Sequence, residues 1–135
     1  MPNKFFEELE TPWQGAIIFL DIDGTLRPDG VGDMSLEVLK KLAELRVKNE
    51  VRLASNKGGK AKKPSKKVAD GVNLKNKKVI VIGDKFLTDG LFAKNIGGEF
   101  VKVKRKISGR ESFFVKLTYL IDDISYGILW KQKNI

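Results

Sequence analysis

The sequence contains no cysteine and no histidine among its 135 residues. Without cysteine, the chain can build no disulfide scaffold, no thiolate zinc site and no hydrolase with a cysteine nucleophile. Without histidine, it can build no Ser-His-Asp triad, no imidazole metal ligand and no histidine general base. Any catalysis by this chain must therefore use carboxylates, hydroxyls, amides and lysines.

Long apolar runs are also absent. No run reaches the roughly 18 to 20 residues that a membrane-spanning helix needs, and the N-terminal stretch MPNKFFEELE is too acidic and broken for a signal peptide. We therefore expect a cytoplasmic protein. With 41% hydrophobic and 32% charged residues, the chain is long enough for one buried core and too short for two. We expect a single domain over residues 1–135.

The chain has few acidic residues relative to basic ones: it contains 26 basic and 17 acidic residues, and its net charge is +9. Such a balance favours anionic partners, namely phosphorylated substrates, nucleic acid or an acidic membrane surface. The excess is concentrated in residues 57–116, which hold 17 basic and 5 acidic residues. The run KGGKAKKPSKK in this segment is either a solvated loop or a feature that attracts a phosphate-bearing substrate.

Apolar runs and helix signals alternate along the chain. The apolar runs predict strands at residues 16–20, 51–54, 79–82 and 100–103. Helix signals predict one helix capped by Ser35, a short one beginning at Pro64, and one over about residues 89–96 that ends at Gly97. This alternation predicts an α/β fold with a parallel sheet.

The C-terminal segment SFFVKLTYLIDDISYGILWKQKNI predicts a further helix with one strongly apolar face. That face carries Phe113, Leu117, Leu120, Ile121, Ile124 and Ile128, enlarged by Phe114, Tyr126 and Trp130. It is more apolar than a surface helix requires. We expect it to pack across the sheet as part of the core; the alternatives are a homodimer face or a contact with a membrane surface.

Polar residues follow three of the predicted strands. They are Asp21, Asp23 and Thr25 after the first, Ser55 and Asn56 after the second, and Asp84 and Asp89 after the third. Ligands of open parallel sheets bind at the carboxyl ends of the strands, so we expect these side chains to converge. Several carboxylates at one site repel one another unless a cation joins them, and an all-oxygen set suits Mg²⁺.

This chemistry is suited to phosphoryl transfer. A metal-bound aspartate can attack phosphorus and become an aspartyl phosphate. Asp21 and Asp23 are two positions apart and point to the same side of an extended chain, so that one can attack while the other protonates the leaving oxygen. Gly24 allows a sharp turn after them. Ser55, the Asn56 amide and Lys63, directly before Pro64, are candidate donors to the transferring phosphoryl group.

The segments FLDIDGTLR, Ser55-Asn56, Lys63-Pro64 and VIGDKFLTDG resemble, in order, the four motifs of the haloacid dehalogenase superfamily. The resemblance implies a Rossmann-type parallel sheet flanked by helices. It implies that Asp21 is the nucleophile and a metal ligand, and that Asp23 is the general acid/base, with its carbonyl also on Mg²⁺. Asp84 would be the remaining carboxylate on the metal and Asp89 a supporting residue, while Ser55 and Lys63 would hold phosphoryl oxygens.

Within that superfamily, the stretch from KAKKPSKKVADG through VIGDKFLTDGLFAKNIGG resembles most the capless phosphatidylglycerophosphate phosphatases. Gly24 stands where that subgroup usually has asparagine. Only seven residues separate Ser55 from Lys63, where the family normally places a helix and an edge strand. The resemblance therefore implies a capless domain whose sheet has a shortened edge.

Three functions remain open at this point. The first is a Mg²⁺-dependent phosphatase of a lipid phosphate, resting on an anionic bilayer through the apolar C-terminal segment. The second is a phosphatase of a nucleic-acid end or of a small sugar phosphate; a nucleic-acid substrate is disfavoured because the aromatic residues are not interleaved with the lysines. The third is a non-catalytic module that binds phosphate.

Overall fold

The structure is a computed structural model and describes residues 4–28, 32–54, 69, 73–109 and 111–130. These residues form a four-stranded sheet in the order β2-β1-β3-β4, in which every pairing is parallel. The strands are β1 (Ile17–Leu20), β2 (Glu50–Leu53), β3 (Val79–Gly83) and β4 (Glu99–Lys102). The predicted α/β class and parallel sheet are confirmed, and each predicted strand overlaps an observed one.

The described helices are α1 (Leu36–Lys48), α2 (Leu91–Ile96) and α3 (Phe113–Ser125). Ser35 caps α1 as predicted, because its hydroxyl accepts a hydrogen bond from the Val38 amide at 3.2 Å. Gly97 ends α2 with a positive φ of 73°. The helix predicted from about residue 89 begins later, at Leu91, because a π-helical turn, η3 (Phe86–Gly90), precedes it. The helix predicted at Pro64 lies outside the described residues.

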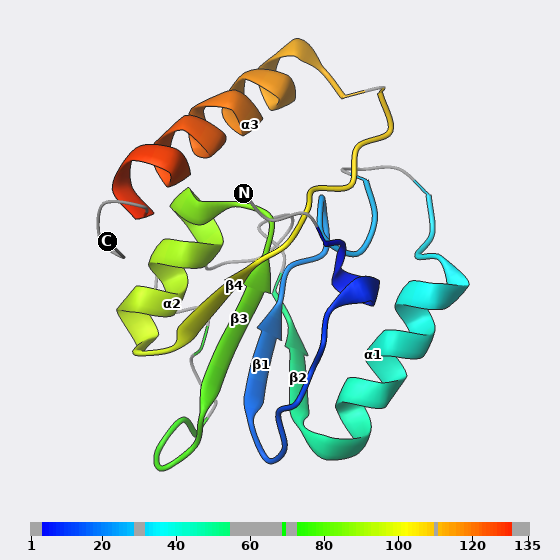
Figure 1. Cartoon of the computed structure of the whole chain (residues 1–135), viewed down its shortest axis with the longest axis vertical. Coiled ribbons are helices and arrows are strands. Elements are labelled where there is room, and N and C mark those ends of the chain that lie inside the picture. The colour runs from blue at the N-terminus through cyan, green and yellow to red at the C-terminus, as the bar shows by residue number, and fades with distance from the viewer. Residues whose placement is uncertain (1–3, 29–31, 55–68, 70–72, 110, 131–135) are drawn as a thin grey trace.

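The sheet is covered on both faces, as the uniformly apolar strands require. Side chains of β1 alternate between the faces: Ile18 and Leu20 pack in the cluster that contains the buried side chains of α1, and Ile17 and Phe19 pack with those of α2. Phe19 meets Phe92 of α2 edge to face, with ring centroids 5.3 Å apart. In Figure 1 the two helices accordingly flank the sheet on opposite sides.

The prediction that the apolar face of the C-terminal helix packs across the sheet is wrong. Figure 1 shows α3 above the carboxyl ends of the strands rather than against a face of the sheet, and Asp122 of α3 accepts hydrogen bonds from the Phe86 and Leu87 amides of η3. The predicted core face is exposed, with 81% exposure at Phe113, 57% at Leu120 and 53% at Ile124. The buried residues of α3 are instead Tyr119 and Asp122. The physical reason is that α1 and α2 already cover the sheet and that α3 is attached through polar contacts, described below.

In the part of the chain that the structure describes, no helix combines the length and the apolar character needed to cross a membrane. The helix α3 has 13 residues.

Candidate functional site

The carboxyl ends of the two central strands bring two of the predicted aspartates together. Strands β1 and β3 are parallel neighbours, with Leu20 paired with Ile82. Asp21 directly follows β1, and its amide donates a hydrogen bond to the Ile82 carbonyl at 3.0 Å. Asp84 directly follows β3, so the two side chains leave the same edge of the sheet.

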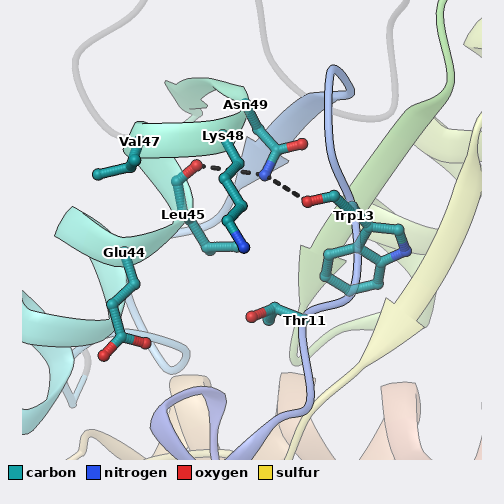
Figure 2. A pocket seen from close by; sticks show the side chains of 7 residues that line it. All are labelled: Thr11, Trp13, Glu44, Leu45, Val47, Lys48 and Asn49. Atoms are coloured by element: carbon teal, nitrogen blue, oxygen red, sulfur yellow. Dashed lines mark hydrogen bonds between the residues drawn. The ribbon is translucent and has the colours of Figure 1, made fainter.

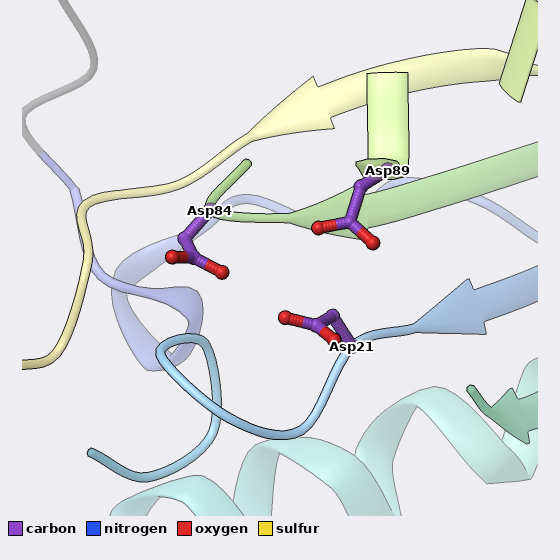
Figure 3. A group of neighbouring side chains, drawn as sticks. All are labelled: Asp21, Asp84 and Asp89. Atoms are coloured by element: carbon purple, nitrogen blue, oxygen red, sulfur yellow. The ribbon is translucent and has the colours of Figure 1, made fainter. Parts of the chain in front are cut away.

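Asp89 completes a group of three buried carboxylates. It lies in η3, the π-helical turn after β3. One oxygen from each of Asp21, Asp84 and Asp89 lies within 4.8 Å of the others, and Figure 3 shows the three side chains converging on a shared space. Their exposed fractions are 9%, 0% and 1%. The sequence analysis gave Asp89 a supporting role, whereas the structure places its carboxylate in the cluster itself.

Thr25 links two of these carboxylates. Its fully buried hydroxyl lies 3.2 Å from Asp21 Oδ2 and 3.2 Å from Asp84 Oδ1. A threonine hydroxyl carries a single hydrogen and can donate to only one of the two oxygens at a time. Thr25 therefore holds the two carboxylates close together without satisfying both, which is a suitable arrangement for oxygens that share a cation.

Two glycines make the close approach of the carboxylates possible. Gly24 has a φ of +85°, so the predicted sharp turn after Asp21 is confirmed. A β-carbon at Gly24 would lie 2.6 Å from Asp84 Oδ2. A β-carbon at Gly83 would overlap the Asp89 side chain. Any larger residue at either position would displace a carboxylate of the cluster.

Asp23, the predicted general acid/base, lies beside the cluster rather than in it. The cluster consists of Asp21, Asp84 and Asp89. Asp23 Oδ1 lies 3.5 Å from Arg27 Nε, and the Asp23 side chain is 14% exposed. Its carboxylate is thus nearer to solvent than the other three.

The predicted phosphate-binding residues Ser55, Asn56 and Lys63 lie outside the described residues. Their proximity to the aspartates therefore stays a prediction. The strand that precedes Ser55 and Asn56 is described: β2 pairs with β1 in parallel, and Leu53 lies beside Leu20.

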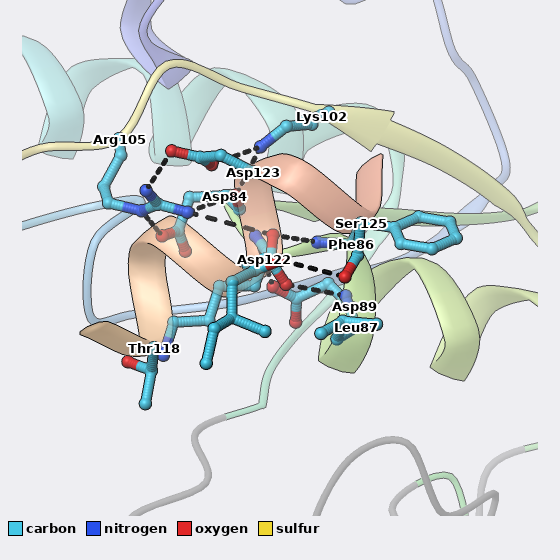
Figure 4. A network of polar contacts seen from close by, with 12 residues as sticks. Asp84, Phe86, Leu87, Asp89, Lys102, Arg105, Thr118, Asp122, Asp123 and Ser125 are labelled. Atoms are coloured by element: carbon cyan, nitrogen blue, oxygen red, sulfur yellow. Dashed lines mark hydrogen bonds and ion pairs between the residues drawn. The ribbon is translucent and has the colours of Figure 1, made fainter. Parts of the chain in front are cut away.

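A network of charged residues, drawn in Figure 4, surrounds Asp84 and was not predicted from the sequence. Arg105 Nε donates to Asp84 Oδ2 at 2.7 Å, and Lys102 Nζ donates to the Asp84 carbonyl at 2.6 Å. On α3, Asp123 accepts from Arg105 at 3.1 Å, while Asp122 accepts from the amides of Phe86 and Leu87, both at 2.8 Å. The adjacent Asp122 and Asp123, the two acidic residues of a largely apolar helix, were the available signal in the sequence.

Burial and charge shift the pKa values of this network. Burial raises the pKa of Asp122 above its usual range, although the Leu87 and Phe86 amides oppose the shift. Burial alone would lower the pKa of Arg105, but the carboxylates of Asp84 and Asp123 together outweigh it and the net shift of the pKa is upward. Burial and the nearby Arg105 charge lower the pKa of Lys102.

A separate pocket of about 330 Å³, shown in Figure 2, is lined by Thr11, Trp13, Glu44, Leu45, Val47, Lys48 and Asn49. It lies at the end of the sheet where the strands begin, opposite to the aspartate cluster. Its lining includes the end of α1 at Lys48, which directly precedes the start of β2. The Asn49 side chain donates to the carbonyls of Trp13 and Leu45 and accepts from the Ala16 amide. Asn49 thus joins the segment before β1 to the end of α1, which is a structural role.

The donor set of the aspartate cluster fits a metal ion. Three carboxylates of like charge in a buried site repel one another, and a cation between them offsets that repulsion. The chain matches no family model, no curated protein and no solved structure. The function is therefore inferred from the motifs and from this buried group of aspartates, which can hold a metal ion.

Proposed function

We propose that this chain is a Mg²⁺-dependent phosphomonoester hydrolase of the haloacid dehalogenase superfamily that forms an aspartyl phosphate on Asp21. The observation that carries the proposal is the convergence of Asp21, Asp84 and Asp89 in one buried cluster. Mg²⁺ prefers oxygen ligands and is commonly held by one or two protein carboxylates together with substrate phosphate and water. Asp21 and Asp84 would hold it, with the Asp23 carbonyl as a further ligand and Asp89 beside them.

Asp21 is the proposed nucleophile. When bound, Mg²⁺ screens the negative charge of the substrate phosphoryl group and polarises its oxygens. A carboxylate oxygen of Asp21 attacks phosphorus, the bond from phosphorus to the ester oxygen breaks, and the phosphoryl group is transferred to Asp21. The buried Thr25 hydroxyl, 3.2 Å from Asp21 Oδ2, holds the carboxylate in place for this attack.

Asp23 is the proposed general acid and base. In the first step its carboxyl group gives a proton to the leaving ester oxygen, which departs as an alcohol. In the second step the resulting carboxylate takes a proton from water, which attacks phosphorus and releases Asp21 and inorganic phosphate. The Asp23 carboxylate is partly exposed at the rim of the site, with its Oδ1 3.5 Å from Arg27 Nε.

The remaining phosphoryl oxygens need donors, and Ser55, Asn56 and Lys63 are the proposed ones. They follow β2, the parallel neighbour of β1, so the topology carries the chain toward the same edge of the sheet. The high lysine content of residues 57–116 supports a substrate that carries negative charge.

The substrate class that α3 favours is a lipid phosphate, such as phosphatidylglycerophosphate, at an anionic membrane surface. One face of α3 exposes Leu117, Leu120, Ile121 and Ile124, preceded by Phe113 and Phe114 and followed by Ile128. Large apolar patches on a surface are typical of contacts with other molecules or with membranes. The opposite side of α3 contacts the loop that carries Asp84, so a bilayer under the exposed face would lie close to the site.

The proposal is tested by phosphate release from dispersed phosphatidylglycerophosphate and from p-nitrophenyl phosphate, each with Mg²⁺ or with EDTA. We expect Mg²⁺-dependent hydrolysis that favours the lipid and is lost in Asp21→Asn. Activity on the soluble ester without a preference for the lipid would keep the phosphatase and replace the lipid by a soluble substrate. A 5′-phosphorylated oligonucleotide in the same assay tests a nucleic-acid end. No release from any of these substrates would leave a phosphate-binding module.

A further inference from the structure

Arg105 lies where the two loops of the proposed metal site meet. It belongs to the connection between β4 and α3, outside every motif that pointed to the site. The Val103 amide donates to the Gly83 carbonyl at 3.0 Å, and the Lys106 amide donates to the Gly24 carbonyl at 2.7 Å. The backbone on either side of Arg105 is thus hydrogen-bonded to the loops that carry Asp84 and Asp21.

The Arg105 side chain is held from several directions. Its Nε donates to Asp84 Oδ2 at 2.7 Å and one terminal nitrogen donates to the Asp84 carbonyl at 3.3 Å. The other terminal nitrogen donates to Asp123 Oδ2 at 3.1 Å, and the guanidinium lies 4.0 Å from the centre of the Tyr119 ring. Only 11% of the side chain is exposed. A guanidinium is rigid and planar and keeps its positive charge across the accessible pH range.

The two oxygens of the Asp84 carboxylate have different partners. Oδ2 accepts from Arg105, while Oδ1 lies 3.2 Å from the Thr25 hydroxyl that also contacts Asp21. Oδ1 therefore lies on the side of the aspartate cluster, and Oδ2 lies on the side of α3. Figure 4 shows the dashed lines from Arg105 to Asp84 and to Asp123 of α3.

We propose that Arg105 is a positioning residue for the metal site, which holds Asp84 Oδ2 toward α3 so that Oδ1 is presented to the divalent cation. This inference rests on the proposed Mg²⁺ site and adds to it a residue that no motif contains. A carboxylate fixed by an outer hydrogen bond loses less rotational freedom on binding a metal. Removal of such partners typically weakens metal binding by about 10 to 100-fold.

The positive charge of Arg105 affects metal binding in the direction opposite to its positioning role, so one experiment can distinguish the two effects. A positive charge next to Asp84 repels a cation, so charge alone predicts tighter metal binding when Arg105 is neutralised. Positioning predicts weaker binding. The two effects therefore differ in sign in one experiment.

The test measures binding of Mg²⁺ and Ca²⁺ by calorimetry, without substrate, to the wild type, Arg105→Met, Arg105→Lys and the control Arg52→Met. Arg52 is half exposed on β2 and pairs with Glu50. We expect the Mg²⁺ dissociation constant to rise about 10 to 100-fold in Arg105→Met and to remain unchanged in Arg52→Met. Arg105→Lys should be intermediate, because an ammonium cannot maintain the forked contacts to Asp84 and Asp123 together.

The selectivity between the two cations separates positioning from a general loss of structure. Mg²⁺ needs near-octahedral geometry, whereas Ca²⁺ tolerates irregular sites, so Arg105→Met should weaken Mg²⁺ binding more than Ca²⁺ binding. The double variant Asp84→Asn/Arg105→Met should bind Mg²⁺ no more weakly than Asp84→Asn, because Arg105 is proposed to act through Asp84.

Each outcome is informative. Equal or tighter Mg²⁺ binding by Arg105→Met overturns the role of Arg105, as does an unchanged preference for Mg²⁺ over Ca²⁺. If Arg105→Met does not fold, Arg105→Lys decides: Mg²⁺ binding equal to that of the wild type overturns the proposal. If the wild type itself binds neither cation, the proposed metal site is wrong, which is a separate result.

Discussion

Gly24 and the carboxylate of Asp84 are in such close contact that a β-carbon at Gly24 would lie 2.6 Å from Asp84 Oδ2. The same oxygen accepts the hydrogen bond from Arg105. The turn after the proposed nucleophile and the loop after β3 therefore meet at the Asp84 carboxylate. Glycine is required at this position for its positive φ and also for its lack of a side chain.

Gly24→Ala should destabilise the fold and also impair the proposed metal site. The left-handed backbone of a non-glycine residue costs on the order of 1–3 kcal/mol. The added methyl group should in addition displace Asp84 and weaken binding of Mg²⁺. Denaturant unfolding with and without Mg²⁺ measures both effects.

Gly32→Ala is the matched control for Gly24→Ala. Gly32 also has a positive φ, of 67°, but a β-carbon there would have no neighbour within 4 Å. Gly32→Ala should lose about as much stability as Gly24→Ala but should still be stabilised by Mg²⁺. If both variants respond to Mg²⁺ like the wild type, the contact between Gly24 and Asp84 has no effect on the site.

Asp21→Asn should abolish phosphate release while the protein remains folded. The amide is nearly isosteric with the carboxylate but cannot form the aspartyl phosphate. The control is Asp33→Asn, the same change at an exposed aspartate. Phosphate release from p-nitrophenyl phosphate measures the effect, and a rate in Asp21→Asn equal to that of Asp33→Asn would exclude Asp21 as the nucleophile.

Mg²⁺ should stabilise the wild type against unfolding. A ligand that binds only the folded state contributes about 2.7 kcal/mol at a concentration one hundred times its dissociation constant. Asp89→Asn removes one of the three clustered carboxylates and should lose most of this increment. Thermal melts at equal ionic strength, with NaCl in place of MgCl₂, provide the comparison. A melting temperature that does not change with Mg²⁺ in the wild type would contradict the metal site.

The exposed face of α3 should be needed for binding to lipid vesicles and for hydrolysis of the lipid phosphate, but not for hydrolysis of a soluble ester. Leu120 and Ile124 are 57% and 53% exposed, so Leu120→Ser/Ile124→Ser should leave the fold intact. We expect weaker sedimentation with anionic vesicles and slower hydrolysis of the lipid phosphate, at an unchanged rate on p-nitrophenyl phosphate.

The control for that variant is Val47→Ser, which removes an apolar side chain that is 82% exposed on α1. It should bind vesicles like the wild type. Unchanged vesicle binding by the α3 variant would contradict the membrane contact. If the α3 variant instead converts a dimer into a monomer in light scattering, the face is a homodimer interface.

Asp122 should make stability depend on pH in a defined direction. Burial raises its pKa in the folded state above the ordinary value of 3.8. The folded protein then binds the proton more tightly than the unfolded chain does, so stability falls as pH rises from about that value through the raised pKa. The decline should be absent in Asp122→Asn. Urea unfolding of both proteins from pH 3 to pH 8 measures it, and parallel curves would contradict the shift.

Much of the fold could be predicted because its signals are local. The apolar runs that became β1 and β3 are continuous and bounded by aspartates, and the caps at Ser35 and Gly97 act within a turn of their own helices. The convergence of Asp21 and Asp84 followed from parallel pairing, since residues after adjacent parallel strands lie at one edge. The π-helical turn η3 was not predicted, because it differs from an α-helix only in its hydrogen-bond spacing.

The sequence by itself determined the fold class, the order of the elements and the aspartates that gather at the end of the sheet, because periodicity and strand ends are properties of short segments. Only the tertiary structure decided how α3 is used. An apolar stripe does not specify whether it is buried, and the apolar face of α3 is exposed because α1 and α2 cover the two faces of the sheet. The contact between Arg105 and Asp84 joins two separate segments of the chain. It forms because the connection after β4 is hydrogen-bonded to the loops that carry Asp84 and Asp21.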